Sequence, residues 1–265
     1  MIEGGLRRKK KMRAQGAASA ALRVSEAINA IVDAPRGATA SEVAPVIGIS
    51  RTASLRLLES MVTAGILSKD QESRRYNLSL QVFQWGSRAA ARFQPSAAAR
   101  QEMTRLASQS GHQLIYSVLD GDSVVVLEAT EHFTAQATTR PVWGRTYWAS
   151  TTTGTLIAAF SEQRTIERLL REFARQNEAP AWPEIEMETL LGELRRQGYA
   201  DRVVQSGVCT IAAPVLDYSG YAVAALGMIV TGNDPLEKER FIDALKATAA
   251  TCSSFLGHHE LNPSD

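Results

Sequence analysis

The sequence predicts an α+β protein with two domains, a small helical domain that ends in a β-hairpin and a larger domain of helices packed on an antiparallel sheet. Three observations support this prediction. Two helical patterns joined by a tight turn occupy residues 39–65. Apolar strand patterns separated by short turns lie at 114–130 and 209–232. The two parts of the chain also differ in the sign of their net charge. Residues 1–92 carry 15 Lys and Arg against 7 Asp and Glu, whereas residues 93–265 carry 14 against 21.

Composition bounds the class of protein. With 265 residues, 45% hydrophobic and 22% charged, the chain is long enough for two packed cores and has the composition of a globular protein. No apolar run approaches the ~20 residues that a membrane helix needs, and the start lacks the apolar core of a secretory signal. Two distant cysteines and four histidines show no metal-ligand spacing. We therefore expect a cytoplasmic protein without membrane, metal or cofactor.

Residues 1–19, MIEGGLRRKKKMRAQGAAS, form a basic cluster without periodicity. They are either a disordered tail or an arm that adds phosphate contacts. Residues 22–34 then show apolar side chains at i, i+3, i+4 and i+7 from Val24, which predicts an amphipathic support helix.

The stretch from Thr39 to Gly65 carries the local signals of two helices and a turn. Thr39 and Glu42 form an S/T-x-x-E capping box, in which each side chain accepts from the backbone N–H of the other residue. Ser50 can cap the second helix after the turn at Gly48, and Gly65 suits a left-handed stop. A helical hairpin that never meets DNA would show the same signals.

The outer face of the second helix carries side chains that suit DNA. An exposed helix start with Arg and hydroxyl groups fits the major groove, because Arg bonds guanine edges and phosphates. The predicted DNA-contacting residues of this helix are Ser50, Arg51, Thr52, Ser54, Leu55 and Arg56.

Residues 66–80 predict a β-hairpin directly after the helix pair, because two short apolar runs flank a charged tip. Lys69, Arg74 and Arg75 would attract DNA phosphates without regard to base sequence. The alternative is an ordinary solvated turn. With the positive charge of residues 1–92, the hairpin favours the wing of a winged helix-turn-helix and double-stranded DNA as the partner.

The remaining chain predicts a linker helix and then the larger domain. Helical patterns cover 80–94, 96–110, 154–161, 162–176, 184–197 and 235–257, and strand patterns cover 114–130, 133–139, 209–217 and 221–232. The aromatic face of 80–94 packs within the chain or across a dimer. The turn inside 114–130 is centred on Asp120-Gly121 or on Gly121-Asp122. Residues 141–153 show weak periodicity and are predicted to be a loop.

Motifs for enzymatic chemistry are missing from the sequence. It contains no GxGxxG or GxxxxGK loop and no G-x-S-x-G elbow. Cys209 could act as a nucleophile, but at the start of an apolar strand we expect it to pack as a small hydrophobe. We therefore expect no catalytic site and a transcription factor that responds to a ligand. The alternative is a metabolic enzyme or small-molecule-binding protein whose helix-turn-helix is only an interaction module.

The order of these parts resembles the IclR family of bacterial transcriptional regulators over roughly residues 20–255. The most specific match is SGVCTIAAPVLDYSGYAVAALG at 206–227, and SRTASLRLLESMVTAGIL at 50–67, YNLSLQVFQWG at 76–86 and the region around Gly154 add to it. The resemblance implies a winged helix-turn-helix domain over 20–79, a linker helix over 80–94 and a GAF-like effector-binding domain over 95–258. It also implies a homodimer or homotetramer on a DNA operator.

In this family, a small organic effector binds between the loop before the Gly154 helix and the last strands. The matching positions are Arg145, Tyr147, Trp148, Ala149, Thr151, Gly154, Asp201, Cys209, Thr210, Gly227 and Ile229. The His and Lys usual in the family are absent from 147–155, and its acidic cluster is reduced to Asp201. These departures imply a roomier, more aromatic pocket, for an organic acid with an aromatic or extended apolar body.

The side chains of 141–153 leave two interpretations open. Its aromatic residues, Trp143 among them, line a pocket or merely cap a core. Arg145 is expected to hold the carboxylate of the effector together with the hydroxyl run from Ser150 to Thr153. Alternatively, Arg145 forms a structural ion pair with Glu128 or Glu131.

Overall fold

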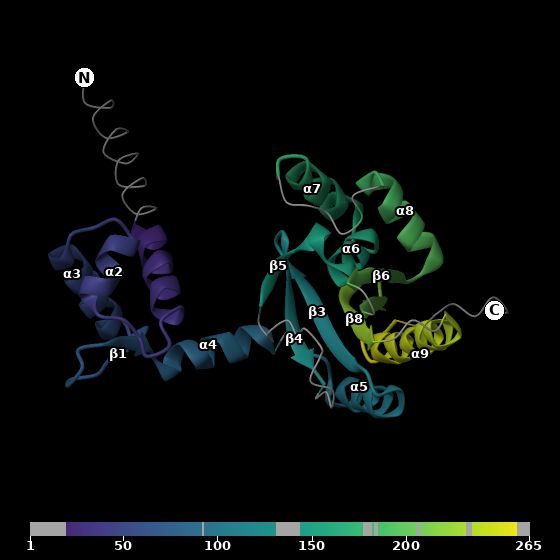
Figure 1. Ribbon diagram of the computed structural model, residues 1–265, viewed down its shortest axis with the longest axis horizontal. Helices are drawn as coiled ribbons and strands as arrows, with labels where there is room; N and C mark the ends of the chain where they lie inside the picture. Colours follow the sequence, from purple (N-terminus) through teal and green to yellow (C-terminus); the bar gives the residue numbers. More distant parts are fainter. Residues whose placement is uncertain are drawn as a thin grey trace, which may run out of the picture. The chain divides into compact units, whose positions relative to one another are not determined.

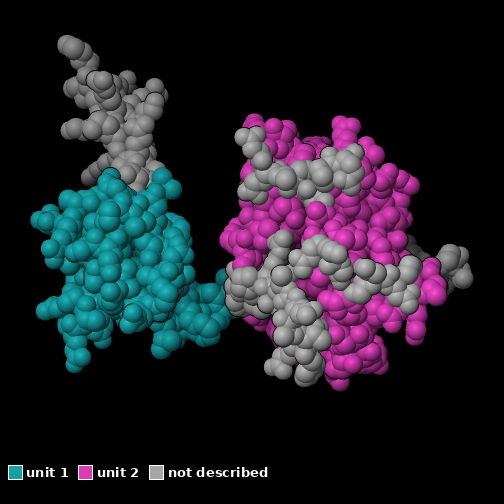
Figure 2. Space-filling model, viewed as in Figure 1, with its two compact units in different colours: residues 1–89 teal, residues 90–265 magenta. Residues whose placement is uncertain are grey.

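A computed structural model describes residues 20–91, 93–130, 144–176, 182, 185–205, 208–231 and 235–258. The chain divides into two compact units, Met1–Ala89 and Ala90–Asp265 (Figure 2). The predicted basic tail over 1–19, the strand expected near 133–139 and Trp143 lie outside the described residues. Among the described helices, none is long and apolar enough to cross a membrane.

The first unit is a helical core with one small hairpin. It contains a helix over residues 20–32, then α2 (Ala40–Val46), α3 (Arg51–Thr63), the antiparallel strands β1 (Leu67–Lys69) and β2 (Tyr76–Leu78), and most of α4 (Leu80–Ala90) (Figure 1). The capping box at Thr39 and Glu42 is present, and Ser50 caps α3. Gly65 has a φ of +76°, as predicted for a left-handed helix stop.

The core of the first unit forms because each element contributes one apolar face. Ile31, Val43, Leu58 and Leu67 are buried together with Tyr76, whose side chain is 1% exposed. The buried face of α3 therefore packs inward, which leaves its opposite face toward solvent.

The second unit is built on one six-stranded antiparallel sheet with the order β5-β4-β3-β8-β7-β6. Its strands are β3 (Gln113–Asp120), β4 (Ser123–Ala129), β5 (Arg145–Tyr147), β6 (Ala200–Gln205), β7 (Val208–Leu216) and β8 (Ala222–Thr231). Its helices are α5 (Ala97–Ser110), α6 (Thr152–Ala159), α7 (Gln163–Phe173), α8 (Met187–Gln197) and α9 (Pro235–Ser254), with a 3₁₀ turn η1 (Trp148–Ser150) before α6.

The two faces of this sheet carry separate cores. Helices α5 and α9 cover one face, whereas α6, α7 and α8 lie over the other (Figure 1). Along β7, Cys209 and Ile211 belong to the core under α5 and α9, while Ala212 belongs to the core under α6. Successive side chains of a strand point to opposite faces, so a shift of one residue changes the layer that a side chain joins.

Three sequence predictions in this unit are settled by the structure. The hairpin turn is centred on Gly121-Asp122, because Asp120 pairs with Ser123 and Gly121 has a φ of +65°. The loop predicted over 141–153 is wrong for its described part, which forms β5, η1 and the first residues of α6. Strand β6 was not predicted, because an edge strand with the sequence ADRVVQ has little apolar alternation.

Both cysteines are buried, and burial raises the pKa of each thiol, to about 11 for Cys252. Because the thiolate is the reactive form, we predict that in the native protein at pH 8 both react more than about 100-fold slower than free cysteine. A colorimetric thiol reagent would measure this, with the unfolded protein as the control that releases both thiols. A native thiol that reacts in the first seconds would contradict the prediction and reopen a chemical role for Cys209.

Candidate functional site

The exposed face of α3 is the first candidate site. Arg51, Thr52, Leu55 and Arg56 all lie on the surface. Ser50 has an extended backbone, and its Oγ accepts a hydrogen bond of 3.2 Å from the N–H of Ala53. The hydroxyl of Ser50 therefore holds the helix start.

Ser54 does not belong to this face, which corrects its place in the predicted DNA-contacting set. Its side chain is 0% exposed, and its hydroxyl is buried without a hydrogen-bond partner in the part of the chain that the structure describes. The helical period explains the difference, because residue 54 shares a face with the buried Leu58 and Met61.

The hairpin β1–β2 presents its three cations differently. Arg74 at the tip is exposed and has a φ of +58°. Lys69 is instead ion-paired with Glu59 at 2.5 Å, and Arg75 is paired with Glu42 at 3.1 Å. Two of the three cations predicted to attract phosphates thus have carboxylate partners within the first unit.

The second candidate site is a cavity of about 150 Å³ between the sheet and the start of α6. Its lining residues come from every strand of the sheet and from the segment that leads into α6. They are Ile115, Val124, Val126, Thr146, Ser150, Thr151, Thr152, Thr153, Arg202, Val204, Val208, Thr210 and Ile229.

One side of this cavity is polar. Arg202 is the one charged residue in the described lining, and it pairs in register with Thr210, which in turn pairs with Ile229. The guanidinium of Arg202 also lies 6.0 Å from the ring centre of Trp182, which limits its freedom. These three paired residues therefore place one cation and one hydroxyl beside an apolar side chain on the cavity wall.

The first turn of α6 forms the opposite polar wall. The hydroxyl of Thr151 caps the helix by accepting the N–H of Gly154 at 2.9 Å. Thr152 and Thr153, both 4% exposed, follow in the first turn and line the cavity. A helix start carries partial positive charge and backbone N–H groups without partners in the helix. With Arg202, this wall makes the cavity favourable for a carboxylate.

The structure brings only part of the predicted effector set to the cavity. Thr151, Thr210 and Ile229 line it. Gly227 borders it, since a Cβ there would lie 2.8 Å from Ile115 and 2.9 Å from Thr153. Gly154 has a packing role, because a Cβ there would come within 2.4 Å of the carbonyl oxygen of Trp148.

The aromatic part of the predicted set lies elsewhere. Tyr147, Trp148 and Ala149 are 7%, 0% and 0% exposed and pack in the core under α6. The roomier, more aromatic pocket is therefore wrong for the described residues, because no aromatic side chain is among those that line the cavity. Tyr147, Trp148 and Ala149 instead stabilise the segment before α6 by packing in this core.

Three charged or polar predictions also fall outside the cavity lining. Arg145 is exposed and pairs with Asp120 at 2.5 Å. Glu128 instead pairs with Arg100, and Glu131 lies outside the described residues. Asp201 contacts Lys238 of α9, and Cys209 packs in the core under α5 and α9.

Strand alternation accounts for the last two errors, and it also shows how the missed residues could have been found. Arg202 pairs with Thr210, whereas Asp201 and Cys209 lie one position away on their strands. The hydroxyl run from Ser150 to Thr153 lines the cavity as predicted, and the residues missed by the sequence prediction are Ile115, Val124, Val126, Thr146, Arg202, Val204 and Val208. Assigning the face of residue 210 first would have selected Arg202 and Val208 over their neighbours.

Comparison with known proteins identifies the class of protein to which both sites belong. A family model described as bacterial transcriptional regulator IclR C-terminal matches residues 89–254. The HTH-type transcriptional regulator KdgR of Escherichia coli is 24% identical over 226 residues, which are 83% of this chain and 86% of KdgR.

Two solved structures show the same fold. An IclR transcriptional regulator from Alicyclobacillus acidocaldarius is 24% identical, covers 90% of this chain and 98% of its own, and has a TM-score of 0.69. An IclR homologue from Microbacterium hydrocarbonoxydans in complex with 4-hydroxybenzoate is 22% identical, covers 91% and 98%, and has a TM-score of 0.72. The family model and the match to KdgR favour the transcriptional regulator over the metabolic enzyme or small-molecule-binding protein that the sequence left open. Because the family model matches more than half of the sequence, the chain belongs to the IclR family of bacterial transcriptional regulators.

Proposed function

We propose that this regulator binds operator DNA as a homodimer and that a small organic acid in the α6 cavity changes this binding. The recognition surface consists of Arg51, Thr52, Leu55 and Arg56 on α3, together with Arg74 of the wing β1–β2. The observation that carries the DNA-binding part is the exposed cationic face of α3, opposite its buried face. Since the operator is part of a bacterial genome, the proposed place of action is the cytoplasm.

The position of the two arginines on α3 suggests different roles. The second helix of a helix-turn-helix enters the major groove with its N-terminal residues against the bases. Arg51 is the first residue of α3, whereas Arg56 lies more than one turn later. We therefore assign Arg51 to a base edge and Arg56 to a phosphate.

Substitution of each arginine tests this assignment. Arg51→Ala is expected to relax sequence preference and to weaken operator binding by ~1–3 kcal/mol, because a bidentate contact to guanine is lost. Arg56→Ala is expected to weaken all sequences alike and to reduce the salt dependence of binding. Fluorescence anisotropy over a salt series would measure both effects. Unchanged operator binding in both variants would remove α3 from the interface.

Exposed apolar side chains in the first unit support a dimer. On α4, Leu80, Phe83 and Trp85 are 81%, 72% and 48% exposed, and Leu22 and Val32 of the first helix are more than half exposed. Large exposed apolar patches on a protein mark surfaces that bind partners. Two copies would also pair two half-sites, which gives an inverted-repeat operator. We propose that α4 and the helix over 20–32 form this contact, in a dimer or in a tetramer of dimers.

The apolar face of α4 can be tested by one charge. Phe83→Glu is expected to shift the protein toward monomer at micromolar concentration, because a buried carboxylate without a partner is costly in an interface. Sedimentation velocity would measure the change. Tyr218→Ser is the matched control, since it removes an exposed aromatic ring from the second unit. A wild-type protein that sediments only as monomer, with and without DNA, would refute the dimer.

The chemistry of the α6 cavity supports an organic acid as the effector. Arg202 and the start of α6 favour a carboxylate, while Ile115, Val126 and Ile229 supply apolar wall. A volume near 150 Å³ matches cavities that hold a single benzene ring. The similar Microbacterium protein holds 4-hydroxybenzoate. We therefore propose a monocarboxylic acid with one ring or a short apolar chain.

A bound acid can alter DNA binding only if it has different affinity for two states of the protein. The cavity is lined both by Ser150–Thr153 at the start of α6 and by the strands of the sheet. Filling it would fix the spacing between these elements. We propose that this change within the second unit is what the linker α4 transmits.

Calorimetric titration with a panel of aromatic and aliphatic acids tests the effector site. Arg202→Gln is expected to lower the affinity for the best acid by about tenfold or more, because a charge-assisted hydrogen bond to the carboxylate is lost. Arg145→Gln is the matched control, since it removes an exposed arginine that is paired with Asp120. Loss of binding in Arg145→Gln but not in Arg202→Gln would place the acid elsewhere.

A further inference from the structure

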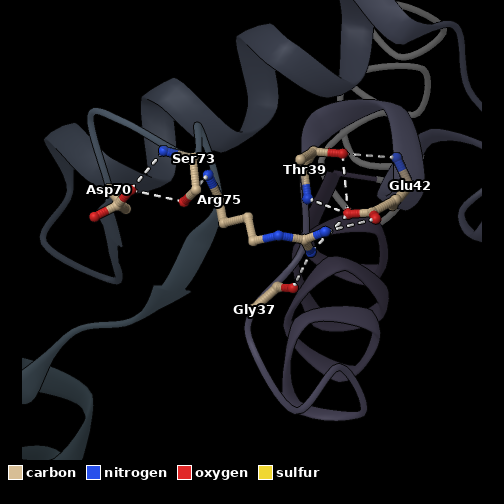
Figure 3. A network of polar contacts seen from close by, with 6 residues as sticks. All are labelled: Gly37, Thr39, Glu42, Asp70, Ser73 and Arg75. Carbon is tan, nitrogen blue, oxygen red and sulfur yellow. Dashed lines mark hydrogen bonds and ion pairs between the residues drawn. The ribbon is translucent and has the colours of Figure 1, made fainter.

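The wing β1–β2 is attached to the helices by two carboxylates. The first is Glu42, which is the third residue of α2 and the acidic member of its capping box. Both of its oxygens accept hydrogen bonds of 3.1 Å from Arg75, which also donates to the carbonyl of Gly37 at 2.7 Å (Figure 3). The same carboxylate accepts the backbone N–H of Thr39 at 2.7 Å. A bidentate arginine pair is geometrically specific, so it fixes the start of β2 against the start of α2.

The second carboxylate is Glu59 on α3. Its Oε1 accepts hydrogen bonds from Lys69 at 2.5 Å and from the phenolic hydroxyl of Tyr76 at 2.7 Å. The side chain of Lys69 is only 16% exposed, and its ammonium lies 5.3 Å from the ring centre of Tyr76. One acid therefore joins both strands of the wing to the recognition helix.

The tip between the strands is held by its own hydrogen bonds. Asp70 Oδ1 accepts from both the N–H and the hydroxyl of Ser73 at 2.7 Å (Figure 3). The following residue, Arg74, takes a left-handed conformation and is exposed. Arg74 and Arg51 line the same surface hollow between the wing, α2 and α3. The tip thus presents Arg74 on the side that carries the first residue of the recognition helix.

We propose that Glu42 and Glu59 are positioning residues for operator binding, which hold Arg75 and Lys69 so that the wing is fixed before DNA arrives and Arg74 is its phosphate-contacting cation. This inference rests on the proposed DNA-binding function. An acid on a DNA-binding unit repels phosphate in general. Here each acid is paired with its own cation, and the fixed wing avoids the cost of ordering a mobile one on binding.

Substitution of Glu42 separates this proposal from a simple charge effect, because the two predict changes of opposite sign. Glutamine at this position keeps the capping box, which accepts Glu or Gln, but removes the charge partner of Arg75. If Glu42 only prevents Arg75 from contacting phosphate, Glu42→Gln frees Arg75 and the variant binds DNA more tightly. If Glu42 positions the wing, Glu42→Gln binds about 3- to 10-fold more weakly.

The measurement is fluorescence anisotropy on a duplex selected by the wild-type protein from random sequences, at several salt concentrations. Glu72→Gln is the matched control, because Glu72 is an exposed acid of the same tip outside the described ion pairs. It should bind as tightly as wild type or slightly better. Arg74→Ala should reduce the slope of log affinity against log salt by about one unit.

A double-mutant cycle, measured on variants whose circular dichroism shows the same folded fraction as wild type, tests whether Glu42 and Arg75 act as a pair in DNA binding. Arg75→Ala should weaken binding in the wild-type background and cost much less in the Glu42→Gln background, since the pair acts as one unit. Tighter binding by Glu42→Gln, or a larger cost of Arg75→Ala in that background, would overturn the positioning role. Binding of Arg51→Ala is measured on the same duplex. If Arg51→Ala weakens binding but Glu42→Gln does not, the recognition helix contacts DNA and only the proposal on the wing is wrong.

Discussion

The alternation of side chains across strands β6, β7 and β8 is the constraint on which the second unit depends. One set, including Cys209 and Ile211, is buried under α5 and α9, and the intervening set meets α6 and the cavity. A strand cannot rotate one residue without exchanging the two sets. The position of Arg202 in the cavity therefore follows from its register with Thr210, and the face of Thr210 is set by its buried apolar neighbours Cys209 and Ile211.

Two glycines let the helix layer approach this sheet closely. A Cβ at Gly154 would meet both the carbonyl of Trp148 and the side chain of Val124, and one at Gly227 would meet Ile115. Where the neighbouring atom belongs to the backbone, as at Gly154, a side-chain rotation cannot relieve such a steric clash. The close approach brings the first turn of α6 to the wall of the cavity, and the first backbone N–H groups of a helix have no partner within the helix. Packing and ligand chemistry thus depend on the same small residues.

Local signals explain what the sequence predicted well. The capping box at Thr39 and Glu42, the stop at Gly65 and the turn at Gly121 need only residues a few positions apart, and all three are present. The errors involve distant partners. The carboxylate of Glu42 lies 33 residues from Arg75 in the sequence, and the layer of Trp148 depends on helices that follow it. Spacing and composition alone carry no information on either contact. The sequence therefore predicted Arg75 as a phosphate-contacting residue and Trp148 as an effector-binding residue, without the ion pair of the first or the burial of the second.

The charge of the first unit shows the same difference between composition and geometry. Of the positive excess in residues 1–92, most lies in residues 1–19, while residues 20–92 carry 9 Lys and Arg against 6 Asp and Glu. Two of these cations, Lys69 and Arg75, are ion-paired with Glu59 and Glu42. Residues 20–92 therefore have little surplus positive charge with which to attract DNA of any sequence. Discrimination between sequences must then come from the placement of a few exposed arginines, and a wing fixed by ion pairs is a way to make that placement reproducible.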